Sequence, residues 1–233
     1  MAEPSKMSAQ VDTIVLGAGC FWGVEKRFEA LPGVVDVVSG YAGGQGVKPR
    51  YADITHSRNK FNPNNHAEVV QVSFQPSLIS LDTLLKHFYE MHDPTQQNRQ
   101  GNDIGTQYRS IILVHSEQQA LTAKDITARY QPLFNAAGYG AIQTQIQPLT
   151  QFYPAEDYHQ DYLAKNPNGY CPDHATGVRF SGETLTAAPM DNSALLQGKH
   201  IVMIDAADYC PYCEIFKADV ANHYQGKIPL HYR

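Results

Sequence analysis

The stretch TIVLGAGCFWGVEKRFEALPG, residues 13–33, indicates both the fold and the chemistry of this chain. Its β-branched start, Thr13 to Leu16, predicts a strand that ends at the small residues Gly17-Ala18-Gly19. Apolar side chains then recur at helical spacing, which predicts a helix over residues 21–31 that the following Pro-Gly pair stops. Cys20 therefore stands between a strand and the first turn of a helix.

The chain beyond this stretch continues to alternate strands and helices. Further strands are predicted over residues 34–38, 67–74, 109–114 and 142–148, the last at a sheet edge because of its proline. Helices are predicted over residues 81–91, after Ser80 as N-cap, and from the N-cap Ser116 to about Tyr130. The order strand, helix, strand, strand, helix, strand predicts a ferredoxin-like βαββαβ sandwich of the α+β class.

Three segments are expected to be irregular. Residues 40–44 are rich in glycine and predict a turn, and residues 48–65 predict a polar loop. The aromatic residues 151–182 are expected to wrap over the sandwich without adding to its sheet.

The chain ends are expected to lie outside this main domain of residues 13–182. Residues 1–12 predict a disordered tail and residues 183–198 a linker rich in Thr, Ala and Ser. In residues 199–233 an apolar strand leads into Cys210-Pro211-Tyr212-Cys213 and a helical pattern. Strand, C-x-x-C and helix open a thioredoxin-like unit, which this segment is too short to complete.

Composition narrows the class of protein. An apolar share of 42% is enough for a core. The formal charge of -5 argues against a nucleic-acid partner, which selects for basic surfaces. The sequence contains no run of about 18 apolar residues, so it predicts no membrane-spanning helix. The start of the chain lacks the apolar core of a signal peptide, so we expect a cytoplasmic protein.

The four cysteines favour redox chemistry. They are too few for a disulfide framework in a chain of this length, which leaves metal binding or redox. Cys20 and Cys171 stand alone, and the pair Cys210 and Cys213 supplies only two of the four ligands that structural zinc takes. We therefore expect neither a metal nor another cofactor.

The position of Cys20 favours a reactive thiolate. Unpaired N–H groups and the helix dipole stabilise an anion at a helix N-terminus. Phe21 and Trp22, the single tryptophan, could hold a small apolar group such as a methyl thioether. The alternative is a buried structural cysteine. A dinucleotide-binding G-x-G-x-x-G motif fails on register, because Trp22 occupies its third glycine position.

Five blocks of sequence stand out along the chain. They are GCFWGVE (19–25), GYAGG (40–44), HAEVV (66–70), GNDIGTQYRS (101–110) and AEDYHQDYL (155–163). In this order they resemble the signature blocks of the A-type peptide methionine sulfoxide reductases, and the resemblance runs from about Thr13 to Phe180.

This resemblance implies roles for individual residues. Cys20 would attack the sulfur of methionine S-sulfoxide, free or in a protein, and Glu68 would deliver the proton that the leaving oxygen needs. Tyr51 and Tyr108 would donate hydrogen bonds to that oxygen, and Asp103 would orient the substrate.

Turnover implies a second thiol. The attack leaves Cys20 as a sulfenic acid, which condenses with a thiol to a disulfide. Cys171, in NPNGYC (166–171), resembles the resolving cysteine of many members. Thioredoxin or a similar dithiol would then reduce the disulfide of a protein that we expect to be monomeric.

Two departures from the family pattern leave questions open. The loop between Tyr51 and Glu68 is longer than usual. The pair Cys210 and Cys213 is either a tethered reductant or a remnant. Outside this family, the residues leave two alternatives, a cysteine hydrolase or acyltransferase with a histidine base and a non-catalytic metal- or protein-binding module.

Overall fold

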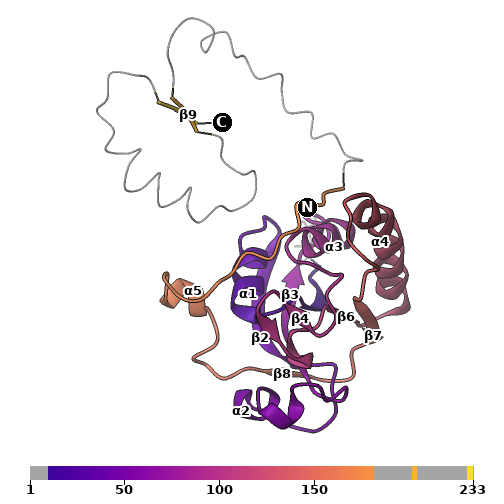
Figure 1. Cartoon of the computed structure of the whole chain (residues 1–233), viewed down its shortest axis with the longest axis vertical. Helices are drawn as coiled ribbons and strands as arrows, with labels where there is room; N and C mark the ends of the chain where they lie inside the picture. Colours follow the sequence, from indigo (N-terminus) through magenta and orange to yellow (C-terminus); the bar gives the residue numbers. More distant parts are fainter. Residues whose placement is uncertain (1–9, 181–200, 204–229, 233) are drawn as a thin grey trace, which may run out of the picture. The chain divides into compact units, whose positions relative to one another are not determined.

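The computed structural model describes residues 10–180, 201–203 and 230–232 (Figure 1). The chain divides into two units, residues 1–180 and residues 181–233. In the second unit, β9 (Ile201–Met203) pairs in parallel with β10 (Leu230–Tyr232). The predicted linker and the pair Cys210 and Cys213 lie outside the described residues. Of the predicted tail over residues 1–12, only residues 10–12 are described, and Asp12 already belongs to β1.

The first unit is a mixed α/β fold built on a six-stranded sheet of order β7-β6-β1-β3-β2-β8. Its strands are β1 (Asp12–Gly17), β2 (Val34–Ala42), β3 (Ala67–Phe74), β6 (Ile111–Val114), β7 (Gln145–Pro148) and β8 (Phe152–Pro154). Neighbouring strands are antiparallel except β6 and β7, which are parallel. A separate ribbon joins β4 (Arg99–Gln100) to β5 (Asp103–Ile104).

Five α-helices and two short 3₁₀ helices complete the described part of this unit. They are α1 (Phe21–Glu29), α2 (Tyr51–Ile54), α3 (Leu81–Glu90), α4 (Glu117–Ala136), α5 (Tyr162–Lys165), η1 (Ser57–Asn59) and η2 (Thr106–Tyr108). Both predicted N-caps are confirmed. Ser80 Oγ accepts a hydrogen bond from the Thr83 N–H at 3.1 Å, and Ser116 Oγ accepts one from the Gln119 N–H at 3.2 Å.

The core follows from the period-two pattern of the strands. Ile14 and Leu16 face the same side of the sheet, where the fully buried Phe28 of α1, Phe88 of α3 and Ile126 of α4 pack on them. Burial of each such side chain contributes about 1.5–3 kcal/mol. The opposite side carries a smaller apolar cluster of Val15, Ala42, Ala67, Val69, Ile111 and Leu113. Three helices thus cover one side of the sheet.

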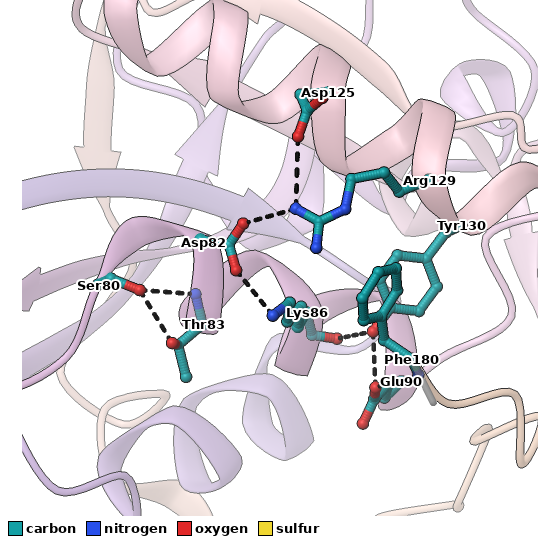
Figure 2. Close-up of polar contacts among 9 residues, drawn as sticks. All are labelled: Ser80, Asp82, Thr83, Lys86, Glu90, Asp125, Arg129, Tyr130 and Phe180. Atoms are coloured by element: carbon teal, nitrogen blue, oxygen red, sulfur yellow. Dashed lines mark hydrogen bonds and ion pairs between the residues drawn. The ribbon is translucent and has the colours of Figure 1, made fainter. Parts of the chain in front are cut away.

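Polar contacts join α3 to α4 and hold the last described residue of the first unit (Figure 2). Arg129 Nη1 lies 2.9 Å from Asp82 Oδ1. Glu90 Oε1 accepts hydrogen bonds from the Tyr130 hydroxyl at 2.6 Å and from the Phe180 N–H at 3.0 Å. These contacts anchor the C-terminal end of the described part of the first unit on α3.

The expectation that residues 151–182 add nothing to the sheet is wrong, because β8 forms its edge beside β2. Gly40 pairs with Pro154. A side chain at Gly40 would come within 2.4 Å of the Phe152 ring, so the absent Cβ permits the approach. The Ala155 N–H extends the pairing by donating to the Ser39 carbonyl at 2.9 Å.

Other boundaries also differ from the prediction. The predicted turn over residues 40–44 overlaps β2, where the fully buried Tyr41 pairs with Glu68. Helix α4 continues past Pro132 instead of ending near Tyr130, because Phe134 is fully buried in the core.

Two predicted segments also change in extent. The predicted loop over residues 48–65 contains α2 and η1. Strand β6 begins at Ile111 instead of Arg109, whose guanidinium donates to backbone carbonyls.

Candidate active site

One pocket brings together seven of the residues that the sequence singled out. Its lining is Cys20, Phe21, Trp22, Tyr51, Glu68, Asp103, Tyr108 and Tyr170, around a volume of about 210 Å³. These residues come from the start of α1, from α2, β3, β5 and η2, and from the segment before Cys171. The sequence had not assigned Tyr170 a role.

Glu68 is the acidic group of the pocket. It lies on β3, is only 2% exposed and accepts a hydrogen bond from the Phe21 N–H at 3.1 Å. Burial raises the pKa of Glu68 to about 8, with a further rise from Asp103, against the opposing effect of the hydrogen bond. The carboxyl group is therefore protonated at neutral pH and can give up a proton.

Cys20 is the N-cap residue of α1 and is partly exposed, as expected of a nucleophile. Burial, and then the negative charge of Glu68, raise the pKa of the Cys20 thiol well above its usual range, and the Trp22 N–H only partly offsets this. These effects oppose the stabilisation of a thiolate that the helix N-terminus provides.

Tyr51 and Tyr108 offer hydroxyl groups to the same pocket. Burial and the charge of Glu68 raise the pKa of Tyr51 to about 12, and the same two causes raise the pKa of Tyr108. Both side chains therefore stay protonated and can donate hydrogen bonds to a developing negative charge.

One carboxylate oxygen of Asp103 has a hydrogen-bond partner and the other has none among the described residues. Its Oδ1 accepts a hydrogen bond from the Tyr170 hydroxyl at 3.3 Å. Its Oδ2 is buried and has no hydrogen-bond partner within the described part of the chain. A buried acceptor without a partner is costly, so a donor on a bound molecule would be favoured here.

Residues of the fifth sequence block hold the aromatic wall of the pocket. The Trp22 ring stacks on Tyr162 at 3.7 Å between ring centres, and its Nε1–H donates to His159 Nδ1 at 3.1 Å. Glu156 accepts hydrogen bonds from the Tyr41 hydroxyl at 2.7 Å and from the Tyr51 N–H at 3.0 Å. The resemblance had covered this block without showing these supporting contacts.

Cys171 lies at a second cavity that also reaches Cys20. Gly23, Arg27 and His174 are among its other lining residues. A Cβ at Gly23 would stand 3.2 Å from the Cys171 Sγ, so the bare helix turn leaves room for this sulfur. Both cysteines are free thiols, and they border one cavity.

Other classes of site find less support among the described residues. A cysteine hydrolase needs a histidine base, and within the described part of the chain none lines the pocket that Cys20 shares with Glu68; His174 lines the second cavity, beside Cys171. No three metal-binding side chains converge within the described ranges. In those same ranges, no helix combines the length and apolar content that crossing a membrane takes.

Two thiols at one cavity, one of them facing a protonated carboxyl group, can pass a pair of electrons to a substrate and then close a disulfide. This arrangement defines the site as that of a thiol-dependent oxidoreductase.

Comparisons with known proteins specify the class further. Residues 12–183 match the model of the family described as peptide methionine sulfoxide reductase. Peptide methionine sulfoxide reductase MsrA 1 of Caulobacter vibrioides is 50% identical over 168 residues, which cover 72% of this chain and 75% of the relative. The corresponding MsrA of Rhodospirillum centenum is 48% identical over 180 residues, with coverage of 77% and 80%.

Solved structures agree with this assignment. Methionine sulfoxide reductase A of Corynebacterium diphtheriae superposes with a TM-score of 0.66 at 46% identity, covering 74% of this chain and 82% of that one. Mxr1 from Saccharomyces cerevisiae in reduced form gives a TM-score of 0.65 at 38% identity, with coverage of 74% and 94%. The chain belongs to the peptide methionine sulfoxide reductase family, which confirms the resemblance seen in its five sequence blocks.

Proposed function

We propose that Cys20 reduces the S epimer of methionine sulfoxide, free or protein-bound, with Glu68 as the proton donor. The observation that carries the proposal is the single pocket that contains both the Cys20 thiol and the buried, protonated Glu68 carboxyl group. A sulfoxide oxygen leaves poorly without a proton, and Glu68 supplies that proton where the oxygen must bind.

The first step transfers oxygen from methionine sulfoxide to Cys20. The Cys20 sulfur attacks the sulfoxide sulfur and forms a sulfur–sulfur bond while Glu68 gives its proton to the oxygen, and the sulfur–oxygen bond of the substrate breaks. The released hydroxyl then bonds to the Cys20 sulfur, the sulfur–sulfur bond breaks with its electron pair leaving on methionine, and Cys20 becomes a sulfenic acid. The proton from the Cys20 thiol replaces the one that Glu68 gave, so the acid is restored and no net proton is consumed.

The other lining residues bind and orient the substrate. Tyr51 and Tyr108 donate hydrogen bonds to the oxygen as its negative charge grows. The open Asp103 Oδ2 accepts a donor from the substrate backbone or amine. Phe21 and Trp22 hold the methyl group of the sulfoxide, since aromatic ring edges attract sulfur and its neighbours.

A second step regenerates the site through Cys171. Its thiol attacks the Cys20 sulfenic acid, a disulfide bond forms and water leaves. The shared cavity and the absent side chain at Gly23 support this pairing. Thioredoxin or a similar dithiol then reduces the disulfide by exchange and returns both thiols.

The test compares the separated S and R sulfoxides of N- and C-blocked methionine. The intact chain should reduce the S epimer and leave the R epimer untouched. Cys20→Ser should abolish the reaction. Cys171→Ser should give one methionine per protein and then stop with thioredoxin as reductant. Turnover of the R epimer alone, or undiminished activity of Cys20→Ser, would contradict the proposal.

The finer description of the chain is also part of the proposal. The strand order β6-β1-β3-β2, with α1 and α3 on one side of the sheet, supports a ferredoxin-like core within the reductase domain of residues 13–182. The parallel pair of β9 and β10 supports a thioredoxin-like segment over residues 199–233, because parallel strands need a crossover connection. The tail of residues 1–12, the linker of residues 183–198 and a cytoplasmic monomer complete this view.

A further inference from the structure

A groove of about 410 Å³ lies beside the substrate pocket. Tyr51, Asp103 and Tyr108 line both hollows, so the groove begins at the reacting end of the site. The remaining lining residues are Thr55, Ser57, Lys60, Asn102, Ile104 and Gln107. A substrate longer than one residue would have to leave the pocket on some side, and the three shared residues make this groove its neighbour.

The outer wall of the groove is the segment that makes the Tyr51-to-Glu68 connection longer than usual. Its backbone is fixed to η2, the element that carries Tyr108. The Thr106 N–H donates to the Lys60 carbonyl at 2.8 Å, and Thr106 Oγ1 donates to the Asn59 carbonyl at 3.0 Å. The groove is therefore preformed, which lowers the entropy cost of binding a chain in it.

Two groups give the groove its chemistry. Gln107 is only 5% exposed, and its Oε1 has no hydrogen-bond partner among the described residues, so it is an open acceptor for an N–H group. Lys60 lines the outer wall and carries a positive charge, with its Nζ 5.6 Å from the centre of the Phe61 ring. Asp103, at the boundary with the pocket, carries the one carboxylate of the lining.

We propose that this groove binds the polypeptide that flanks the sulfoxide in a protein substrate, and that Lys60 favours an acidic side chain in that flank. The proposal rests on the sulfoxide reduction proposed above for the adjoining pocket. An extended peptide has a backbone N–H for Gln107 Oε1, and a Glu or Asp side chain complements Lys60 while a Lys or Arg side chain does not.

The experiment measures kcat/KM for three substrates with thioredoxin as reductant. These are N- and C-blocked methionine S-sulfoxide, a blocked pentapeptide with that residue at its centre and Glu elsewhere, and the same peptide with Lys in place of Glu. The intact chain should prefer the Glu peptide by about two- to five-fold, the range of an exposed charge pair. Raising the salt should shrink this preference.

Lys60→Glu should reverse the peptide preference and leave kcat/KM for the blocked residue unchanged. Lys124→Glu, the same charge change on the exposed side of α4, is the matched control and should keep the original preference. A preference that Lys60→Glu leaves intact would overturn the groove assignment. Failure of the intact chain to reduce the blocked residue would instead overturn the proposed function.

Discussion

The backbone N–H of Phe21 donates a hydrogen bond to Glu68 Oε2 at 3.1 Å. Phe21 follows Cys20 directly and begins α1, while Glu68 lies on the central strand β3. The contact therefore fixes the position of the acid relative to the nucleophile. Burial raises the pKa of both groups, and the charge of Glu68 raises the pKa of Cys20 further.

Replacement of the acid should impair the first chemical step. Glu68→Gln keeps an oxygen that can accept the Phe21 N–H but has no proton of comparable acidity to give. We expect the single-turnover rate of methionine formation to fall by about 10²- to 10⁴-fold, the usual contribution of general acid catalysis. Glu29→Gln, on the exposed end of α1, serves as the control. A rate within two-fold of the intact chain would contradict the role of Glu68.

The same substitution should make Cys20 easier to ionise. Removal of the Glu68 charge takes away a cause of the raised Cys20 pKa, so alkylation of Cys20 should begin at lower pH in Glu68→Gln. In the intact chain, Glu68 loses its proton as pH rises through about 8, so activity should decline above that pH. Iodoacetamide labelling of the Cys20 peptide, followed by mass spectrometry against pH, measures the first effect. An unchanged labelling profile would refute the coupling.

Each tyrosine hydroxyl should contribute separately. Tyr51→Phe and Tyr108→Phe should each lower kcat/KM for the blocked sulfoxide by about 10²- to 10³-fold, if each hydroxyl acts as a donor to developing charge. Tyr158→Phe is the control, since Tyr158 is 62% exposed. Steady-state kinetics of the three variants decide the matter. If kcat/KM falls no further in Tyr51→Phe and Tyr108→Phe than in Tyr158→Phe, these two hydroxyl groups do not stabilise the developing charge.

Arg27 should favour the resolving step. It lies 2.9 Å from Asp173 and borders the cavity of Cys20 and Cys171. Burial raises the pKa of the Cys171 thiol, and the charge of Arg27 partly offsets that rise. Arg27→Met should leave the sulfenic acid burst intact and slow disulfide formation by up to about five-fold, the scale of one ion pair. Dimedone trapping and quenched-flow thiol counts measure the two steps.

Lys165→Met, which breaks an exposed ion pair with Asp161, should change neither rate. Equal disulfide rates in Arg27→Met and the intact chain would show that Arg27 does not position Cys171.

The helix beyond Pro132 should be part of the stable core. Phe134→Ala removes a fully buried ring and should lower the free energy of unfolding by about 3–5 kcal/mol. Leu121→Ala, at a position 54% exposed on the same helix, should stay within about 0.5 kcal/mol. Urea denaturation gives both values. A small effect at Phe134 would mean that the last turn of α4 packs loosely.

The elements predicted correctly are those whose formation depends on residues near each other in the sequence. The alternation of residues 67–74 gave both bounds of β3, and the serine N-caps gave the first residues of α3 and α4. The sequence blocks likewise singled out most of the pocket lining, because their residues lie on or directly after such elements. Glu68 and Cys20 are examples, on β3 and at the start of α1.

Features that depend on distant partners were missed. Strand β8 is three residues long and is defined by its pairing with β2, which no pattern within residues 152–154 reveals. Pro132 normally ends a helix, but burial of Phe134 outweighs the lost hydrogen bond. The raised pKa of Cys20 depends on burial and on carboxylates that only the folded sheet and loops bring near it.

Because Gly23 has no side chain, the sulfurs of Cys20 and Cys171 can lie on separate parts of the chain and still border one cavity. One sulfur is held rigidly at the head of a helix, where accuracy of attack matters, and the other arrives on a crossing segment over a helix turn without a side chain. Selection can therefore tune the speed of recycling by altering that segment while the geometry that recognises damaged methionine stays the same. A methyl group at position 23 would press on the Cys171 sulfur. Attack by Cys20 and resolution by Cys171 would then both depend on how far the segment that carries Cys171 can shift.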